Sequence, residues 1–181
     1  MRVSVFIFIG WLALSLTACS FNKLDREEAK MLIEDFYEYP NVETAEFSLD
    51  LNLTGIEPHQ RLIDDGYLIF SQYSSHLGIS EKGFLYKGEE KRNVTFATNL
   101  RYFKEITGIR YENDDKTKAI VEFDIERRNI TPFGEQKGYN EGDIEPYHVE
   151  FQKYDDGWRV TTKNKGGNKL QEDFPDVEEF K

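Results

Sequence analysis

The sequence is short of cysteine and of positive charge, and each shortage excludes a class of protein. Cys19 is the only cysteine in 181 residues, so the chain cannot form an internal disulfide or supply a cysteine-rich zinc site. Its 23 Lys+Arg stand against 34 Asp+Glu, giving a net charge of -11. Such a chain is repelled by a nucleic-acid backbone. We therefore expect neither a disulfide framework nor a nucleic-acid partner.

The first residues of the chain contain its longest apolar run. Arg2 is the only charged residue before the segment from Val3 to Leu16. This segment contains no charge and is mostly apolar. A transmembrane helix needs about 20 apolar residues, and this run is shorter and ends in small residues. The pattern is that of a signal peptide, which is removed during export.

The run ends in Leu16-Thr17-Ala18-Cys19, which resembles the lipobox of bacterial lipoproteins. The resemblance implies that a diacylglycerol is attached to Cys19 through a thioether, that the signal peptidase cleaves between Ala18 and Cys19, and that a third acyl chain is added to the new amino terminus. Several acyl chains together give stable anchoring. Ser20, which follows the cysteine, favours the outer membrane over the inner membrane, so we expect a lipid-anchored protein on the periplasmic face.

These features divide the chain into four parts. We expect a cleaved signal peptide at 1–18, a lipidated tether at 19–24, a single domain at 25–163 and a flexible acidic tail at 164–181. Hydrophobic residues make up 39% of the chain and aromatic residues 14%, which is enough for one packed domain of this length. The signal peptide carries only one charge, a positive one, so the mature chain is more acidic than the whole.

Helical patterns come first in the expected domain. Asp25 followed by Glu28 resembles a capping box, and apolar residues then recur at helical spacing, so we expect a helix over Asp25–Tyr39. Alternating apolar residues predict a half-buried strand over Phe47–Leu53. A second, short helix follows from Pro58, with Gly66 as its left-handed cap before the apolar run 67–70, although residues 64–66 could equally form a hairpin turn.

Strand patterns dominate from residue 78 onward. We expect strands at Phe84-Leu85-Tyr86 and at 94–96, a long hairpin formed by Leu100–Tyr111 and Ala119–Ile130, and a second hairpin formed by 147–151 and 158–160. In Leu100–Tyr111 apolar residues occur at both odd and even positions. Either a bulge shifts the register there or some of these side chains face outward as a binding surface.

Helices followed by a run of antiparallel strands predict an α+β domain, in which N-terminal helices pack on a curved antiparallel sheet. In the order of its elements the domain is loosely similar to NTF2-like and cystatin-like proteins. No diagnostic motif supports that similarity, so it carries no functional residue over to this chain.

Motifs for catalysis and metal binding are few. The three histidines, His59, His76 and His148, have none of the spacings of metal sites. The elbow Gly-x-Ser-x-Gly does not occur in the mature chain, and side chains of the adjacent pairs Asp64-Asp65 and Asp155-Asp156, at i and i+1, diverge. We expect no metal, no cofactor and no catalytic residue.

The loop after Gly138 is the one acidic segment that could hold calcium. It contains oxygen ligands but lacks the order of a high-affinity calcium loop, so we favour a solvated acidic loop. Its candidate ligands are Asn140, Glu141, Asp143 and Glu145.

The chain as a whole favours a non-enzymatic, lipid-anchored envelope protein that binds a partner protein or a small ligand on the periplasmic side. One specific form would be an immunity or inhibitor lipoprotein, whose acidic surface meets a basic partner. The alternative is a small-ligand-binding or enzymatic NTF2-like domain, with a pocket between helices and sheet and a histidine beside a buried carboxylate.

Overall fold

The structure is a computed structural model, and it describes residues 23–90 and 94–161. The elements in chain order are α1 (Arg26–Tyr37), β1 (Asn41–Phe47), α2 (Leu51–Thr54), η1 (Glu57–His59), α3 (Gln60–Asp64), β2 (Leu68–Ile69), β3 (Gly78–Ile79), α4 (Glu81–Phe84), β4 (Lys87–Glu90), β5 (Val94–Tyr111), β6 (Lys118–Arg128), α5 (Pro132–Gln136), β7 (Ile144–Tyr154) and β8 (Gly157–Val160).

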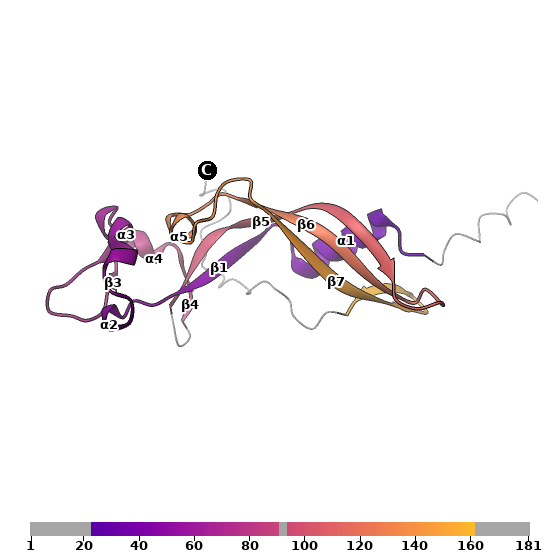
Figure 1. Cartoon of the computed structure of the whole chain (residues 1–181), viewed down its shortest axis with the longest axis horizontal. Coiled ribbons are helices and arrows are strands. Elements are labelled where there is room, and N and C mark those ends of the chain that lie inside the picture. Colours follow the sequence, from indigo (N-terminus) through magenta and orange to yellow (C-terminus); the bar gives the residue numbers. More distant parts are fainter. Residues whose placement is uncertain (1–22, 91–93, 162–181) are drawn as a thin grey trace, which may run out of the picture.

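A strongly curled antiparallel sheet forms the body of the molecule. Its strands lie in the order β1-β5-β6-β7-β8, and β4 pairs with β5 outside this path. The molecule is elongated, with α1 at one end, α2, α3 and β3 at the other, and β1 and β5 running between them (Figure 1). The predicted α+β class, with helices packed on a curved antiparallel sheet, is confirmed.

Helix α1 begins where the sequence predicts and ends two residues earlier. Asp25 is its N-cap and accepts a hydrogen bond from the Glu28 backbone N–H at 2.8 Å. Glu38 adopts the left-handed conformation and ends the helix before Pro40. Leu24, which we assigned to the tether, is buried, and its carbonyl accepts a hydrogen bond from the Tyr111 hydroxyl at 3.2 Å.

The residues beneath α1 form the larger apolar core, here called the α1 core. Ala29 and Ile33 of the helix have no exposed surface and pack on inward-facing residues of β5, β6, β7 and β8. The rings of Phe103 and Phe123 stack at 5.9 Å between their centroids. The face of the sheet under α1 is therefore closed by side chains, and we call it the helix-covered face.

A second, aromatic core lies at the other end of the same face. Phe133 of α5 stacks on Phe96 of β5, with ring centroids 4.0 Å apart, and Phe47 meets both rings edge-on. Gly134 permits this approach, because a Cβ there would lie 2.1 Å from the Thr98 carbonyl oxygen. Short helices and the β2–β3 hairpin cover the aromatic core with Leu62, Leu68 and Leu77.

Two predicted strands are wrong. Residues 47–53 do not form one strand, because β1 ends at Phe47 and Asp50 caps the short helix α2 by accepting the Asn52 backbone N–H at 2.9 Å. Residues 84–86 are not a strand either, since Ser80 caps α4 by accepting the Gly83 N–H at 3.0 Å. In both places a polar side chain that satisfies helix N–H groups outweighs the local strand pattern.

The predicted hairpins and the helix cap are confirmed. β5 pairs with β6, and β7 with β8, in antiparallel register. The pairing of β5 with β6 shifts twice, between Phe103 and Glu105 and between Ile106 and Gly108, so a bulge explains the mixed pattern of Leu100–Tyr111. Gly66 follows α3 with a φ of 76°, as a left-handed cap requires.

Candidate functional site

The lipobox residues, Ala18 and Cys19 among them, lie outside the described residues, as does the predicted tail at 164–181. Lipidation and cleavage thus stay predictions. No helix within the described part of the chain is long and apolar enough to cross a membrane.

The three histidines lie apart from one another. His148 is exposed on β7, opposite Glu122 of β6. His76 is exposed in the β2–β3 loop, where its backbone forms an isolated antiparallel β-bridge with the backbone of Asp50. His59 is buried, with Nε2 at 3.3 Å from the Thr54 hydroxyl. Their spacing in the sequence does not predict a shared site, and the fold does not bring the three histidines together.

His59 lies in an environment that disfavours the charged form of its imidazole. Burial lowers the pKa of its imidazole, the positive charge of Lys137 lowers it further, and the backbone of Ser48 opposes both. The folded state therefore favours the neutral ring. An unfolded chain takes up the proton near the ordinary value of 6.5, so the stability that the neutral ring contributes is present above that value and is lost as pH falls toward the lowered pKa of the folded state.

Replacing His59 by leucine should flatten the pH dependence of stability. Between about pH 7.5 and about pH 5.5 the unmodified protein should lose more free energy of unfolding than His59→Leu does, because the variant has no proton to take up at this position. Urea unfolding at both pH values measures the two losses. Equal losses in the unmodified protein and in His59→Leu would contradict the assignment.

The acidic loop before β7 uses its polar groups within the protein. Asp143 accepts the backbone N–H of Asn140 at 2.8 Å, and Glu141 accepts those of Asn129 and Ile130. Glu145 pairs with Arg127. The four candidate calcium ligands thus point to separate partners rather than to one point.

The adjacent carboxylate pairs diverge, as their spacing predicts. Asp64 accepts a hydrogen bond from Gln60 at 2.7 Å, whereas Asp65 lies 3.7 Å from Arg61. Asp156 pairs with Arg159. Among residues 23–90 and 94–161, no three side chains of His, Cys, Asp or Glu are grouped so that they could hold a metal ion.

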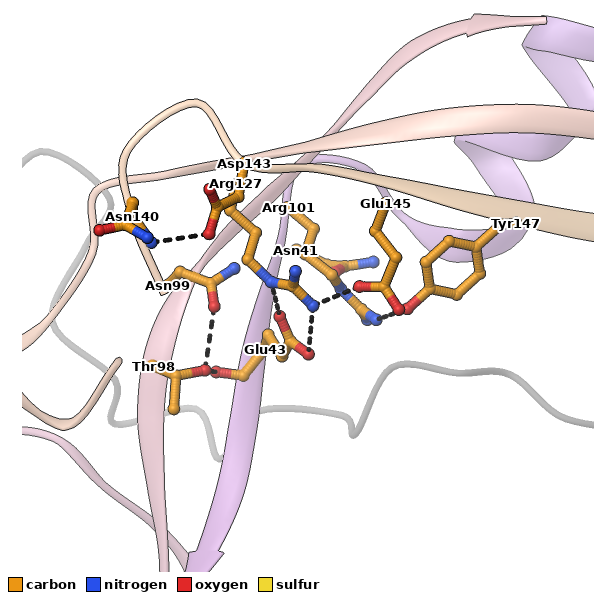
Figure 2. A network of polar contacts seen from close by, with 10 residues as sticks. All are labelled: Asn41, Glu43, Thr98, Asn99, Arg101, Arg127, Asn140, Asp143, Glu145 and Tyr147. Atoms are coloured by element: carbon orange, nitrogen blue, oxygen red, sulfur yellow. Dashed lines mark hydrogen bonds and ion pairs between the residues drawn. The ribbon is translucent and has the colours of Figure 1, made fainter. Parts of the chain in front are cut away.

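A buried polar cluster lies on the helix-covered face between the two cores, and we call it the polar waist (Figure 2). At its centre Arg127 of β6 binds Glu43 of β1 through Nε at 2.8 Å and Nη2 at 3.3 Å, and Nη2 also contacts Glu145 of β7. The Tyr139 ring lies 4.3 Å from the guanidinium carbon. The arginine is only 11% exposed in its side chain and joins three segments that are distant in sequence.

Arg101 forms the second half of the polar waist. It is 4% exposed, and its Nε donates to the Asn41 side-chain oxygen at 3.0 Å while Nη1 donates to the Tyr147 hydroxyl at 3.4 Å. Burial raises the pKa of the Tyr147 phenol. Asn99, two residues before Arg101 on β5, is also buried, and its Nδ2 has no hydrogen-bond partner among the described residues.

Electrostatics keep the central arginine of the polar waist charged and the neighbouring phenol neutral. Burial alone would lower the pKa of Arg127, but the hydrogen bond that it donates to Glu43 and the charges of Glu43 and Glu145 raise that pKa above the ordinary value. Burial also raises the pKa of Tyr39, so this phenol stays protonated at neutral pH. The polar waist therefore holds ion pairs and protonated phenols, which join β1, β5, β6 and β7.

One feature of the sequence indicates this cluster: two arginines stand at inward positions of predicted strands. In an alternating strand, residues two apart share a face. Arg127 shares its face with the inward residues Ile125 and Phe123, and Arg101 shares its face with Phe103. A charged residue at an inward position predicts a buried partner of opposite charge, although the sequence does not say which.

The opposite face of the sheet, here called the open face, carries an acidic strip. Asp124 of β6 is paired directly with Glu105 of β5, and Glu122 of β6 lies opposite Gly108. Like charges on directly opposed residues weaken a sheet, so this arrangement costs folding stability. The strip extends over three adjacent strands and consists of Glu105, Glu122, Asp124, Glu126 and Glu150, of which Glu126 is paired with Arg128 at 2.8 Å.

The strip is accessible to solvent. It lies on the part of the sheet whose other face is covered by α1. Glu105, Glu122 and Glu150 are exposed, and Asp124 and Glu126 are half-buried. Their neighbours along the strands, Phe123 and Ile125, point the other way into the α1 core. Beneath α1 the sheet is thus packed on one face and acidic on the other, whereas toward β1 the open face is covered over the buried residues Val42, Ala97 and Leu100.

Fold and site together define an α+β protein with two apolar cores, a buried polar waist between them and an acidic strip on the open face of the sheet. No family model, no curated protein and no solved structure matches the chain. The likeness to NTF2-like and cystatin-like proteins in element order stays a prediction.

Proposed function

We propose that this is a lipid-anchored protein of the bacterial cell envelope, held by acyl chains on Cys19, and that its domain binds a basic partner protein through the acidic strip of the open face. It acts as an interaction module, of the immunity or inhibitor kind, on the periplasmic side of the outer membrane. The single observation that carries the proposal is the direct pairing of Asp124 with Glu105 on an exposed sheet face.

The charge arrangement supports a basic partner for a physical reason. Repulsion between opposed carboxylates is relieved when a cationic surface covers them, so the folding cost of the strip is recovered on binding. Complementary charge also speeds encounter and rejects partners of the same sign. The full chain has a net charge of -11, which extends this field beyond the strip.

A pocket enzyme is the weaker alternative. The space between α1 and the sheet is filled by side chains of the α1 core, including Ile33 and Phe123, which have no exposed surface. His76 and His148 are exposed on other surfaces, and His59 lies in the aromatic half of the molecule. None of the described histidines stands beside the carboxylates of the polar waist.

Charge reversal on the open face should release the partner. The protein and its variants are solubilised from their own membranes, and co-purifying proteins are quantified at about 50 mM and about 500 mM NaCl. We expect Glu122→Lys with Asp124→Lys to reduce the co-purified partner at least about tenfold, and high salt to do the same, because both remove the attraction.

The control carries the same charge change away from the strip. Asp155→Lys with Asp156→Lys, in the exposed turn between β7 and β8, should retain the partner at low salt. If both double variants lose the co-purified partner equally, only the net charge matters. If both retain it equally, the open face is not the binding site. Either result contradicts the proposal.

A further inference from the structure

The most exposed apolar side chains gather at the end of the molecule farthest from Leu24. Tyr73, in the loop between β2 and β3, is 99% exposed, and Leu53 of α2 is 79% exposed. Ile69 and Phe70, at the start of the same loop, are also exposed. A soluble surface seldom leaves an aromatic side chain uncovered to this extent without a use for it.

The loop that carries Tyr73 is held at its base. The Leu51 N–H donates to the Ser75 carbonyl at 2.7 Å, and the Leu77 N–H donates to the Leu49 carbonyl at 2.8 Å. These two bonds fasten the loop to the segment that enters α2. A loop fixed in this way presents its aromatic side chain with little further loss of conformational entropy on binding.

Serine side chains fix the tip of the loop as well. The Ser71 hydroxyl accepts the Tyr73 backbone N–H at 3.3 Å, and the Ser74 hydroxyl accepts the His76 N–H at 3.1 Å. Tyrosine and serine together are the residues that antibody loops use, because tyrosine supplies a rigid contact area and serine supplies adaptable hydrogen bonds.

The composition of this segment identifies the chemistry of its partner. From Gly66 to Ser80 there is no Lys, Arg, Asp or Glu, in a chain of which 31% is charged. Depletion of charge with enrichment of aromatic residues characterises the centre of protein interfaces. The complementary surface is therefore an uncharged protein surface with an apolar pocket, unlike the cationic surface that fits the acidic strip.

The position of the loop fits a partner away from the membrane. Tyr111, at one end of β5, contacts Leu24, a few residues after Cys19, whereas Phe96 near the other end belongs to the aromatic core. With 18 residues at roughly 3.3 Å each, β5 measures at most about 55 Å along its length, and its two ends lie in the two different cores. This step rests on the proposed lipid anchor at Cys19.

We infer that the β2–β3 loop is a second docking surface, at which Tyr73 inserts into an uncharged apolar pocket of a protein that lies farther from the membrane than the acidic strip. This contact is apolar and therefore insensitive to salt.

Site-specific photo-crosslinking in the full-length protein, in its own cells, tests the inference. The photoreactive amino acid p-benzoylphenylalanine is placed at position 73 and, as a matched control, at position 154, where Tyr154 is exposed near the opposite end. We expect one discrete protein adduct from position 73 and none of that mass from position 154.

The crosslinked protein is then purified and its binding measured by calorimetry. We expect Tyr73→Ala to weaken binding at least about tenfold and Tyr154→Ala to leave it unchanged. The affinity should be the same in about 50 mM and about 500 mM NaCl.

Several results would overturn the inference. These are the same adduct from position 154, an adduct that consists only of two copies of this chain, adducts with lipid or glycan alone, no adduct at position 73, or binding that is lost in high salt. If the charge-reversed open face still releases its partner while position 73 gives no protein adduct, this inference fails and the proposed function stands.

Discussion

Replacing Phe133 by alanine should lower the free energy of unfolding by about 4 kcal/mol, the cost of removing a fully buried ring and leaving a cavity. The ring has no exposed surface and stacks on Phe96 with an interplanar angle of 6°. The neighbouring turn is fixed, since the Thr131 hydroxyl donates to the Ala97 carbonyl at 2.6 Å and accepts the Gly134 N–H at 3.1 Å. The site therefore cannot collapse to fill the space.

The matched control is Phe84→Ala, which truncates a phenylalanine that is 61% exposed. It should cost less than about 1 kcal/mol, because little apolar surface returns to water. Urea unfolding followed by circular dichroism gives both values. If the two truncations cost the same, Phe133 does not hold the aromatic core together.

The second large effect is expected in the polar waist. Arg127→Met should destabilise the protein by about 3 kcal/mol, because Glu43 and Glu145 would then be left as partly buried carboxylates without a counter-charge. We expect the lower end of the range for buried ion pairs, since the Glu145 side chain is 38% exposed and water relieves part of the loss.

Two further variants separate charge from packing in the polar waist. Arg159→Met breaks the pair with Asp156, in which both side chains are more than half exposed, and should cost less than about 1 kcal/mol. Adding Glu43→Gln to Arg127→Met should restore part of the lost stability, because one uncompensated charge is removed. Further destabilisation by Glu43→Gln would show that the loss at Arg127 comes from packing.

The sequence predicted those parts of the fold that depend on short-range patterns. The capping of α1 by Asp25, the left-handed conformation of Gly66 and the bulged hairpin of β5 and β6 all depend on neighbouring residues, and each was found. Helices α2 and α4 were missed because each has only four residues, too few for a helical period to appear.

The polar waist could not be predicted because it depends on pairing between distant residues. Glu43 and Arg127 are 84 residues apart and meet only after β1 and β6 have both paired with β5. The acidic strip has the same origin: Glu105 and Asp124 become neighbours only when the bulges in β5 set the register. A net charge of -11 indicated an acidic surface, but not which face carries it.

The most direct test of a lipid-anchored envelope protein is the intact mass of the mature chain isolated from its own membranes. We predict a chain that begins at Cys19 and carries a diacylglyceryl group, with a further acyl chain on its amino terminus, and we predict that Cys19→Ala abolishes both the modification and the membrane association. A chain that still begins at Met1, or an unmodified Cys19 in a protein that stays on the membrane, would contradict the account.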